Sequence, residues 1–241
     1  FVTGIVTTDN LTGATPAAFY AHRTERDLTK EIASDLVKSP LNLFIGGGKD
    51  DFTKFEQDET INLKKAGFEL SSSLEKLGKS KSEKVGFFAS QNELPKVMNG
   101  REGYLSTATK AGLQFLASKN KPFFLMVEGA FIDSGGHIND SQTVIEEGID
   151  FDQAIAEALK FADQNGKTLV IITADHETGG VTLPQGNIKE QKVELEFTTE
   201  DHTAIMVPIF AYGPMSNNFR GVYENSEVFQ KIKEVLAQHL Q

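Results

Sequence analysis

The chain has 241 residues, 39% of them hydrophobic and 24% charged, which suits one globular α/β domain and excludes a disordered chain. Its net charge is −10, from 34 acidic and 24 basic residues, and this argues against general nucleic-acid binding. Cysteine is absent, which excludes disulfides and thiolate metal ligands, and no apolar run is long enough for a membrane span. An anionic substrate stays compatible with this charge if metal ions and an arginine reverse the local field.

Strands and helices alternate in the first half of the chain. Residues 1–8 predict a strand, and Pro16 to Lys38 predicts a helix that is interrupted near Thr24, where Thr24 and Asp27 resemble a capping pair. Gly46 to Gly48 predicts a tight turn rather than a phosphate loop, because no Gly-Lys-Ser/Thr follows. The other elements predicted up to residue 128 are strands over 41–45, 84–88 and 123–128 and helices over 59–66, 72–77 and 104–117.

The second half of the chain continues the alternation. Its predicted elements are helices over 143–161 and 224–240 and strands over 168–173, 193–197 and 207–212. The strand at 193–197 alternates like a half-buried strand, and Pro208 marks the start or the edge of a strand. Alternating strands and helices favour an α/β fold, a three-layer α/β/α sandwich with a mostly parallel sheet, as a single domain over residues 1–241.

The strand predicted at 168–173 leads directly into Asp175 and His176. In open α/β sheets ligands bind beyond the carboxyl ends of the strands, so this carboxylate and imidazole suggest two ligands of one zinc-like ion. A structural contact between the histidine and the backbone is the alternative. His202 precedes the strand at 207–212 and is a weaker candidate, because a lone histidine there is more often a surface residue.

The strand predicted at 123–128 delivers a second group of the same kind. Glu128 ends this strand, and a buried carboxylate needs a partner, either a metal ion or a nearby lysine or arginine. Asp133 and His137 share a face if their segment is helical, but Gly135 and Gly136 make a tight loop equally compatible. A surface ion pair is the alternative for these two residues. Two strands that each deliver acids and a histidine to one sheet edge indicate a metal-dependent enzyme.

Taken together, these motifs resemble the alkaline phosphatase family. The matching stretches follow the family's order and are 14–22, 45–48, 124–129, 173–176, 202–203 and 211–214. They include Ala14-Thr15-Pro16-Ala17-Ala18 and Thr173-Ala174-Asp175-His176. The resemblance implies the three-layer α/β sandwich and the hydrolysis of phosphate monoesters with two zinc ions and one magnesium ion. It also implies a homodimer and a periplasmic or extracellular location.

The resemblance assigns five residues to zinc. Asp133, His137 and His202 would bind the first zinc ion, and Asp175 and His176 would supply part of the second site. Two zinc ions roughly 4 Å apart would stabilise the attacking and leaving oxygens of an in-line displacement.

The resemblance assigns three further residues to magnesium and substrate. Thr15 and Glu128 would bind magnesium, which prefers hard oxygen ligands. Arg26 stands at the spacing of the family's substrate arginine and would clamp two phosphate oxygens. Gly13 stands where many relatives carry aspartate or histidine, so we expect a more open outer shell at the magnesium site.

Part of the family's site precedes the segment that begins at Ala14. The nucleophilic serine or threonine and an aspartate that bridges zinc and magnesium both lie upstream of it in the family, and only 13 residues precede it here. We therefore expect an N-terminally incomplete alkaline phosphatase, inactive as an isolated chain, whose phosphoserine or phosphothreonine would form on an upstream residue. Thr7, Thr8 and Asp9 lack the motif context, so the sequence assigns them no role.

Two other interpretations stay open. Phosphodiesterases, sulfatases and phosphomutases share the metal scaffold, although Arg26 and the Thr15 and Glu128 pair favour monoesters. The chain could also be a metal-binding fragment without catalysis, and the missing nucleophile supports this.

Overall fold

The computed structural model describes residues 1–54 and 58–239 of the chain. It contains two compact units. The first unit comprises Phe1–Ser134 and Gln142–Ala154, and the second unit comprises Gly135–Ser141 and Ile155–Gln241. Among the described residues, no helix combines the length and the apolar character that crossing a bilayer requires.

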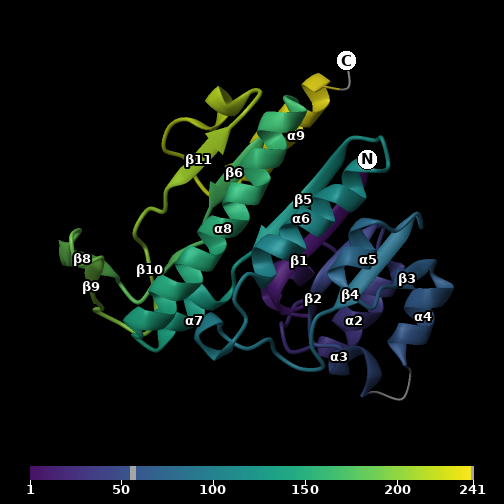
Figure 1. Ribbon diagram of the computed structural model, residues 1–241, viewed down its shortest axis with the longest axis horizontal. Helices are drawn as coiled ribbons and strands as arrows, with labels where there is room; N and C mark the ends of the chain where they lie inside the picture. The colour runs from purple at the N-terminus through teal and green to yellow at the C-terminus, as the bar shows by residue number, and fades with distance from the viewer. Residues whose placement is uncertain (55–57, 240–241) are drawn as a thin grey trace. The chain divides into compact units, whose positions relative to one another are not determined.

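A five-stranded parallel sheet forms the centre of the first unit (Figure 1). Its strands, in spatial order, are β3 (Phe68–Leu70), β4 (Lys84–Phe88), β2 (Leu43–Gly47), β1 (Val2–Asn10) and β5 (Phe123–Glu128). The four strands predicted in this region are confirmed, and β3 is additional, because three residues are too few to show a period of two. Thr7 of β1 pairs in register with Glu128, the last residue of β5, so the end of β5 lies beside the second half of β1.

Helices cover both faces of this sheet. Alternate residues of β1 belong to two separate cores, Val6 to one and Ile5 to the other, as the side-chain period of two requires. The helices of the first core are α5 (Leu74–Gly78), α6 (Tyr104–Ala117) and the start of α8 (Ser141–Asn165). The opposite side carries α1 (Ala14–Ala18), α2 (Thr29–Lys38), α3 (Asp50–Thr53) and α4 (Glu59–Lys65). The predicted three-layer α/β architecture is confirmed.

The stretch from Pro16 to Lys38 contains two helices rather than one interrupted helix. Residues 19–28 connect α1 to α2 without helical structure. The capping pair predicted at Thr24 and Asp27 is wrong, because α2 begins at Thr29 after Leu28, which makes no side-chain capping bond. Arg26 therefore lies in an exposed turn.

Close packing of β2 and β4 depends on Gly86. A Cβ atom at Gly86 would lie 1.9 Å from Cζ of Phe44, a ring that is fully buried. Gly86→Ala should therefore destabilise the fold by about 1–3 kcal/mol through overpacking. Gly148→Ala is the matched control, because an added Cβ there meets nothing within 4 Å and α8 should gain about 0.5–1 kcal/mol of helix propensity. Urea midpoints measure both changes, and equal midpoints would contradict the expectation.

The second unit contains antiparallel strand pairs. The pairs are β11 (Ile209–Tyr212) with β6 (Val170–Thr173), β10 (His202–Thr203) with β7 (Glu177–Thr178), and β8 (Thr182–Asn187) with β9 (Lys192–Glu196). Strand β11 begins directly after Pro208, as predicted. Helix α9 (Glu227–His239) closes the chain, and residue 240 of the helix predicted there lies outside the described residues.

The strand predicted at 193–197 is present as β9, but its half-buried character is wrong. Most of β9 is exposed, and it forms a hairpin with β8, which the sequence did not predict. Pro184 and Gly186 lie within β8, and both residue types are depleted in strands. Short 3₁₀ turns at Val97–Asn99 and Ser216–Phe219 complete the described elements.

Candidate metal centre

The segment with two glycines forms a helix, α7 (Phe131–His137). Asp133 and His137 therefore lie one turn apart on the same face, and the tight-loop alternative is wrong. Glycine at 136 serves packing: a Cβ atom there would lie 2.8 Å from the carbonyl oxygen of Thr178 in β7. Gly136 thus lets α7 approach β7 closely.

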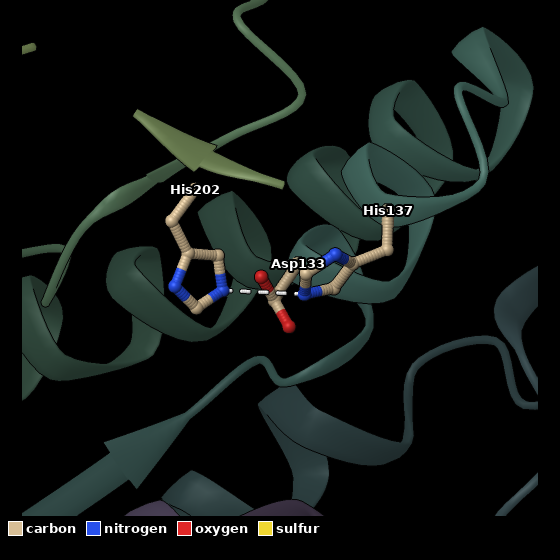
Figure 2. A group of neighbouring side chains, drawn as sticks. All are labelled: Asp133, His137 and His202. Atoms are coloured by element: carbon tan, nitrogen blue, oxygen red, sulfur yellow. Dashed lines mark hydrogen bonds between the residues drawn. The ribbon is translucent and has the colours of Figure 1, made fainter. Parts of the chain in front are cut away.

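Asp133, His137 and His202 converge from α7 and β10 (Figure 2). Each offers one ligand atom, and these atoms lie within 4.8 Å of one another. Nε2 of His137 is 3.2 Å from Nε2 of His202. Two nitrogens bound to a tetrahedral zinc ion would be roughly 3.3 Å apart, given Zn–N bonds of about 2.0–2.1 Å. One carboxylate and two imidazoles also form a donor set that zinc accepts, so the group fits a zinc ion.

A contact behind the ring sets the tautomer of His137. Its Nδ1 lies 2.6 Å from the carbonyl oxygen of Glu200. A carbonyl oxygen can only accept, so Nδ1 carries a proton, and in the neutral ring the lone pair that a metal ion needs is then on Nε2. Histidines that bind metals almost always donate their second ring N–H in this way.

The second predicted pair, Asp175 and His176, lies beside this group. Both residues lie between β6 and β7, and the His176 ring stacks on the His202 ring with centroids 3.5 Å apart and planes at 23°. Oδ2 of Asp175 is 3.2 Å from Nε2 of His176, and Nδ1 of His176 is 3.2 Å from the hydroxyl of Thr178. A further carboxylate and imidazole are therefore available next to the first group.

The two residues predicted for magnesium, Thr15 and Glu128, belong to the first unit. Glu128 is the last residue of β5, and its Oε2 accepts a 2.5 Å hydrogen bond from the hydroxyl of Thr7. Thr15 is the second residue of α1, the short helix that follows β1. Hydroxyl and carboxylate oxygens are ligands that suit magnesium, so both residues fit that ion by their chemistry.

Asp9 extends this polar region at the end of β1. Its Oδ2 would lie only 2.0 Å from a Cβ atom at Gly13, so the carboxylate occupies the space that a side chain at position 13 would need. Burial raises the pKa of Asp9 and Glu93 adds to this, while the Asn10 backbone N–H and Arg26 act in the opposite direction. Arg26 is therefore within electrostatic reach of Asp9.

Sequence reasoning missed Thr7 and Asp9 as members of this region. They belong to no motif, and the available signal was the run Thr7-Thr8-Asp9 where an apolar strand pattern ends. Thr8 is also fully buried, and its hydroxyl oxygen accepts the backbone N–H of Ala130, which follows β5. The end of β1 thus supports the segment between β5 and α7.

Comparisons with known proteins agree with the resemblance seen in the sequence. A family model described as alkaline phosphatase matches residues 1–193 and 185–238. Alkaline phosphatase 4 of Bacillus subtilis (strain 168) is 29% identical over an alignment 310 positions long, which covers 97% of this chain and 67% of that protein. The alkaline phosphatase of Escherichia coli (strain K12) is 28% identical over 305 residues, which cover 98% of this chain and 65% of that protein. The chain thus spans about two thirds of the length of these relatives.

The solved structures include a close structural match. Alkaline phosphatase from the Antarctic bacterium TAB5 matches with a TM-score of 0.91 and 42% identity, covering 98% of this chain and 72% of that one. A mutant of the TAB5 enzyme is known with Mg bound in its M3 site.

Proposed function

Because the chain belongs to the alkaline phosphatase family, we propose that the protein hydrolyses phosphate monoesters to an alcohol and inorganic phosphate with the help of bound metal ions. The observation that carries this proposal is the group of Asp133, His137 and His202, whose ligand atoms lie within 4.8 Å of one another. A family relationship alone would leave open whether this chain retains a metal site. The convergence of these side chains supports that it does.

The proposed metal content is two zinc ions and one magnesium ion. Asp133, His137 and His202 hold the first zinc ion, and Asp175 and His176 hold part of the second. When bound, zinc supplies Lewis-acid stabilisation of the attacking and leaving oxygens and a hydroxide near neutral pH.

The residues of the first unit hold magnesium and substrate in this proposal. Thr15 and Glu128 bind the magnesium ion through oxygen atoms. Arg26 lies in an exposed turn and donates two parallel hydrogen bonds to the phosphate. A phosphoserine or phosphothreonine intermediate would form on a nucleophile upstream of Phe1, and an aspartate upstream of Phe1 would complete the ligands of zinc and magnesium.

Assembly and location follow from the resemblance. We propose that the protein acts as a homodimer on a small phosphate monoester, in the periplasm or outside the cell. Light scattering on the purified protein and fractionation of the producing cells would test the two statements separately.

A substrate comparison tests the proposed reaction. With zinc and magnesium present, the full-length protein that includes the upstream nucleophile should hydrolyse p-nitrophenyl phosphate with a kcat/KM on the order of a thousandfold above that for bis(p-nitrophenyl) phosphate. Asp175→Ala should abolish turnover of the monoester, because it removes a carboxylate proposed for the second zinc ion. Glu190→Ala is the control, since Glu190 lies at the exposed end of the β8–β9 hairpin, and should keep full activity.

Other outcomes of these assays would support a different function. Faster hydrolysis of the diester would favour a phosphodiesterase on the same scaffold. Zinc binding without turnover of either ester would favour the non-catalytic interpretation. Full activity of Asp175→Ala would contradict the proposed zinc sites.

A further inference from the structure

Thr7 is a buried polar residue in the second half of β1, with 0% of its surface exposed. Its hydroxyl takes part in two hydrogen bonds. It lies 2.5 Å from Oε2 of Glu128 and 2.8 Å from the backbone nitrogen of Asp9. These contacts join β1, which lies between β2 and β5 in the sheet, to the carboxylate that ends β5.

The direction of both hydrogen bonds follows from the chemistry of the partners. The backbone N–H of Asp9 can only donate, so it occupies a lone pair of the Thr7 hydroxyl oxygen. An ionised carboxylate can only accept, so the hydroxyl proton points at Glu128. The Thr7 hydroxyl is therefore a donor of fixed direction, not a group that rotates to suit its surroundings.

The backbone of Thr7 is held on two sides. Parallel pairing sets Thr7 opposite Glu128, and the hydroxyl of Tyr104 donates a 3.3 Å hydrogen bond to the Thr7 carbonyl oxygen. The side chain of Tyr104 packs against the core that contains Val6. A donor with so little freedom can define the orientation of the carboxylate that it contacts.

We propose that Thr7 is a positioning residue of the magnesium site, which holds the Glu128 carboxylate in one orientation for a hard divalent cation. This inference rests on the proposed function and deepens it. The hydrogen bond from Thr7 engages one of about four acceptor positions of the Glu128 carboxylate and so limits its rotation. Magnesium demands near-ideal octahedral geometry, so a ligand fixed in advance lowers the cost of ordering it.

A buried hydrogen bond could also contribute to fold stability alone. Variants that keep the shape of the side chain, with and without the hydroxyl, distinguish a positioning role from a structural one. Thr7→Val keeps the shape and removes the hydroxyl, whereas Thr7→Ser keeps the hydroxyl. Thr109→Val is the matched control. Thr109 is 1% exposed on α6, and its hydroxyl oxygen has no hydrogen-bond partner among the described residues, so the same exchange there breaks no such bond.

The readout is binding of divalent cations, measured apart from activity. Each protein is stripped with chelator, reloaded with zinc and titrated with manganese by electron paramagnetic resonance and with magnesium by calorimetry. Thr7→Val should lower the affinity for both ions 10–100-fold, the usual effect of losing a group that orients a metal ligand. Thr7→Ser should stay within about threefold of the wild type, and Thr109→Val should not differ from it.

Other outcomes overturn the proposal. If Thr7→Val lowers the thermal midpoint of the metal-free protein but binds manganese as tightly as the wild type does, the role of Thr7 is only structural. If the wild type binds neither manganese nor magnesium beyond its zinc, the magnesium site fails and the role of Thr7 fails with it. The zinc group and the monoesterase assay would then still stand or fall on their own results.

Discussion

Replacing His202 with alanine is expected to remove one zinc ion per chain and to lower kcat/KM for phosphate monoesters by on the order of a thousandfold or more. His202 supplies one of the three ligand atoms of the candidate zinc site, and its ring also stacks on His176. One substitution therefore disturbs both proposed zinc positions. Metal analysis after dialysis and an assay with p-nitrophenyl phosphate would measure the two effects.

His22→Ala is the control for this prediction. His22 lies in the exposed connection between α1 and α2, so its loss should change neither zinc content nor turnover. A His202→Ala protein that keeps its full zinc content would show that the ion binds elsewhere. Loss of zinc with unchanged turnover would show that this ion is not needed for the reaction.

Replacing Arg101 with methionine is expected to destabilise the fold by about 3–5 kcal/mol, the usual effect of removing one partner from a buried ion pair. The side chains of Arg101 and Glu147 are each 2% exposed and that of Asp150 is 4% exposed. Nη1 of Arg101 donates to Asp150 at 2.8 Å, and Nη2 donates to Glu147. The variant would leave two buried carboxylates without their cation.

Urea unfolding measures this effect, and Lys79→Met provides the comparison. Lys79 pairs with Glu75 on the surface of α5, where solvent screens the pair, so its loss should cost far less than the loss of Arg101. Similar losses of unfolding free energy for the two variants would show that burial does not strengthen the ion pairs of Arg101.

The Arg101 guanidinium also lies 5.5 Å from the ring centroid of Phe131, the first residue of α7. The buried ion pairs thus contact the helix that carries Asp133.

The layered fold could be predicted from the sequence because its signals are local. The strand at 123–128 and the helix at 104–117 have the predicted bounds, since apolar periodicity persists over their whole length. The connection from α1 to α2 and the β8–β9 hairpin could not be predicted in the same way. Tertiary packing determines where α1 ends and α2 begins. The proline and glycine of β8 weaken the strand pattern that would have predicted the hairpin.

The candidate site could likewise be predicted only in part. Residue types at strand ends pointed to Asp175 and Glu128, and the resemblance turned His202 from a weak candidate into an expected zinc ligand. Local propensity could not decide between helix and loop around Gly135, because glycine disfavours a helix, and the close approach of β7 to Gly136 favours glycine there. Thr7 could not be recognised, because its role depends on a partner 121 residues away.

In the sequence, the hairpin of β8 and β9 lies between His176 and His202. The energetic effect of its length determines how many residues can be inserted there. The entropy lost in closing a loop grows only with the logarithm of its length, about 0.6 kcal/mol per doubling. The short β7–β10 pairing keeps the two histidines together whatever the hairpin contains. Ile188, near the hairpin tip, is 96% exposed. Inserted residues at this tip would thus cost little free energy, and the spacing of the two imidazoles would not depend on them.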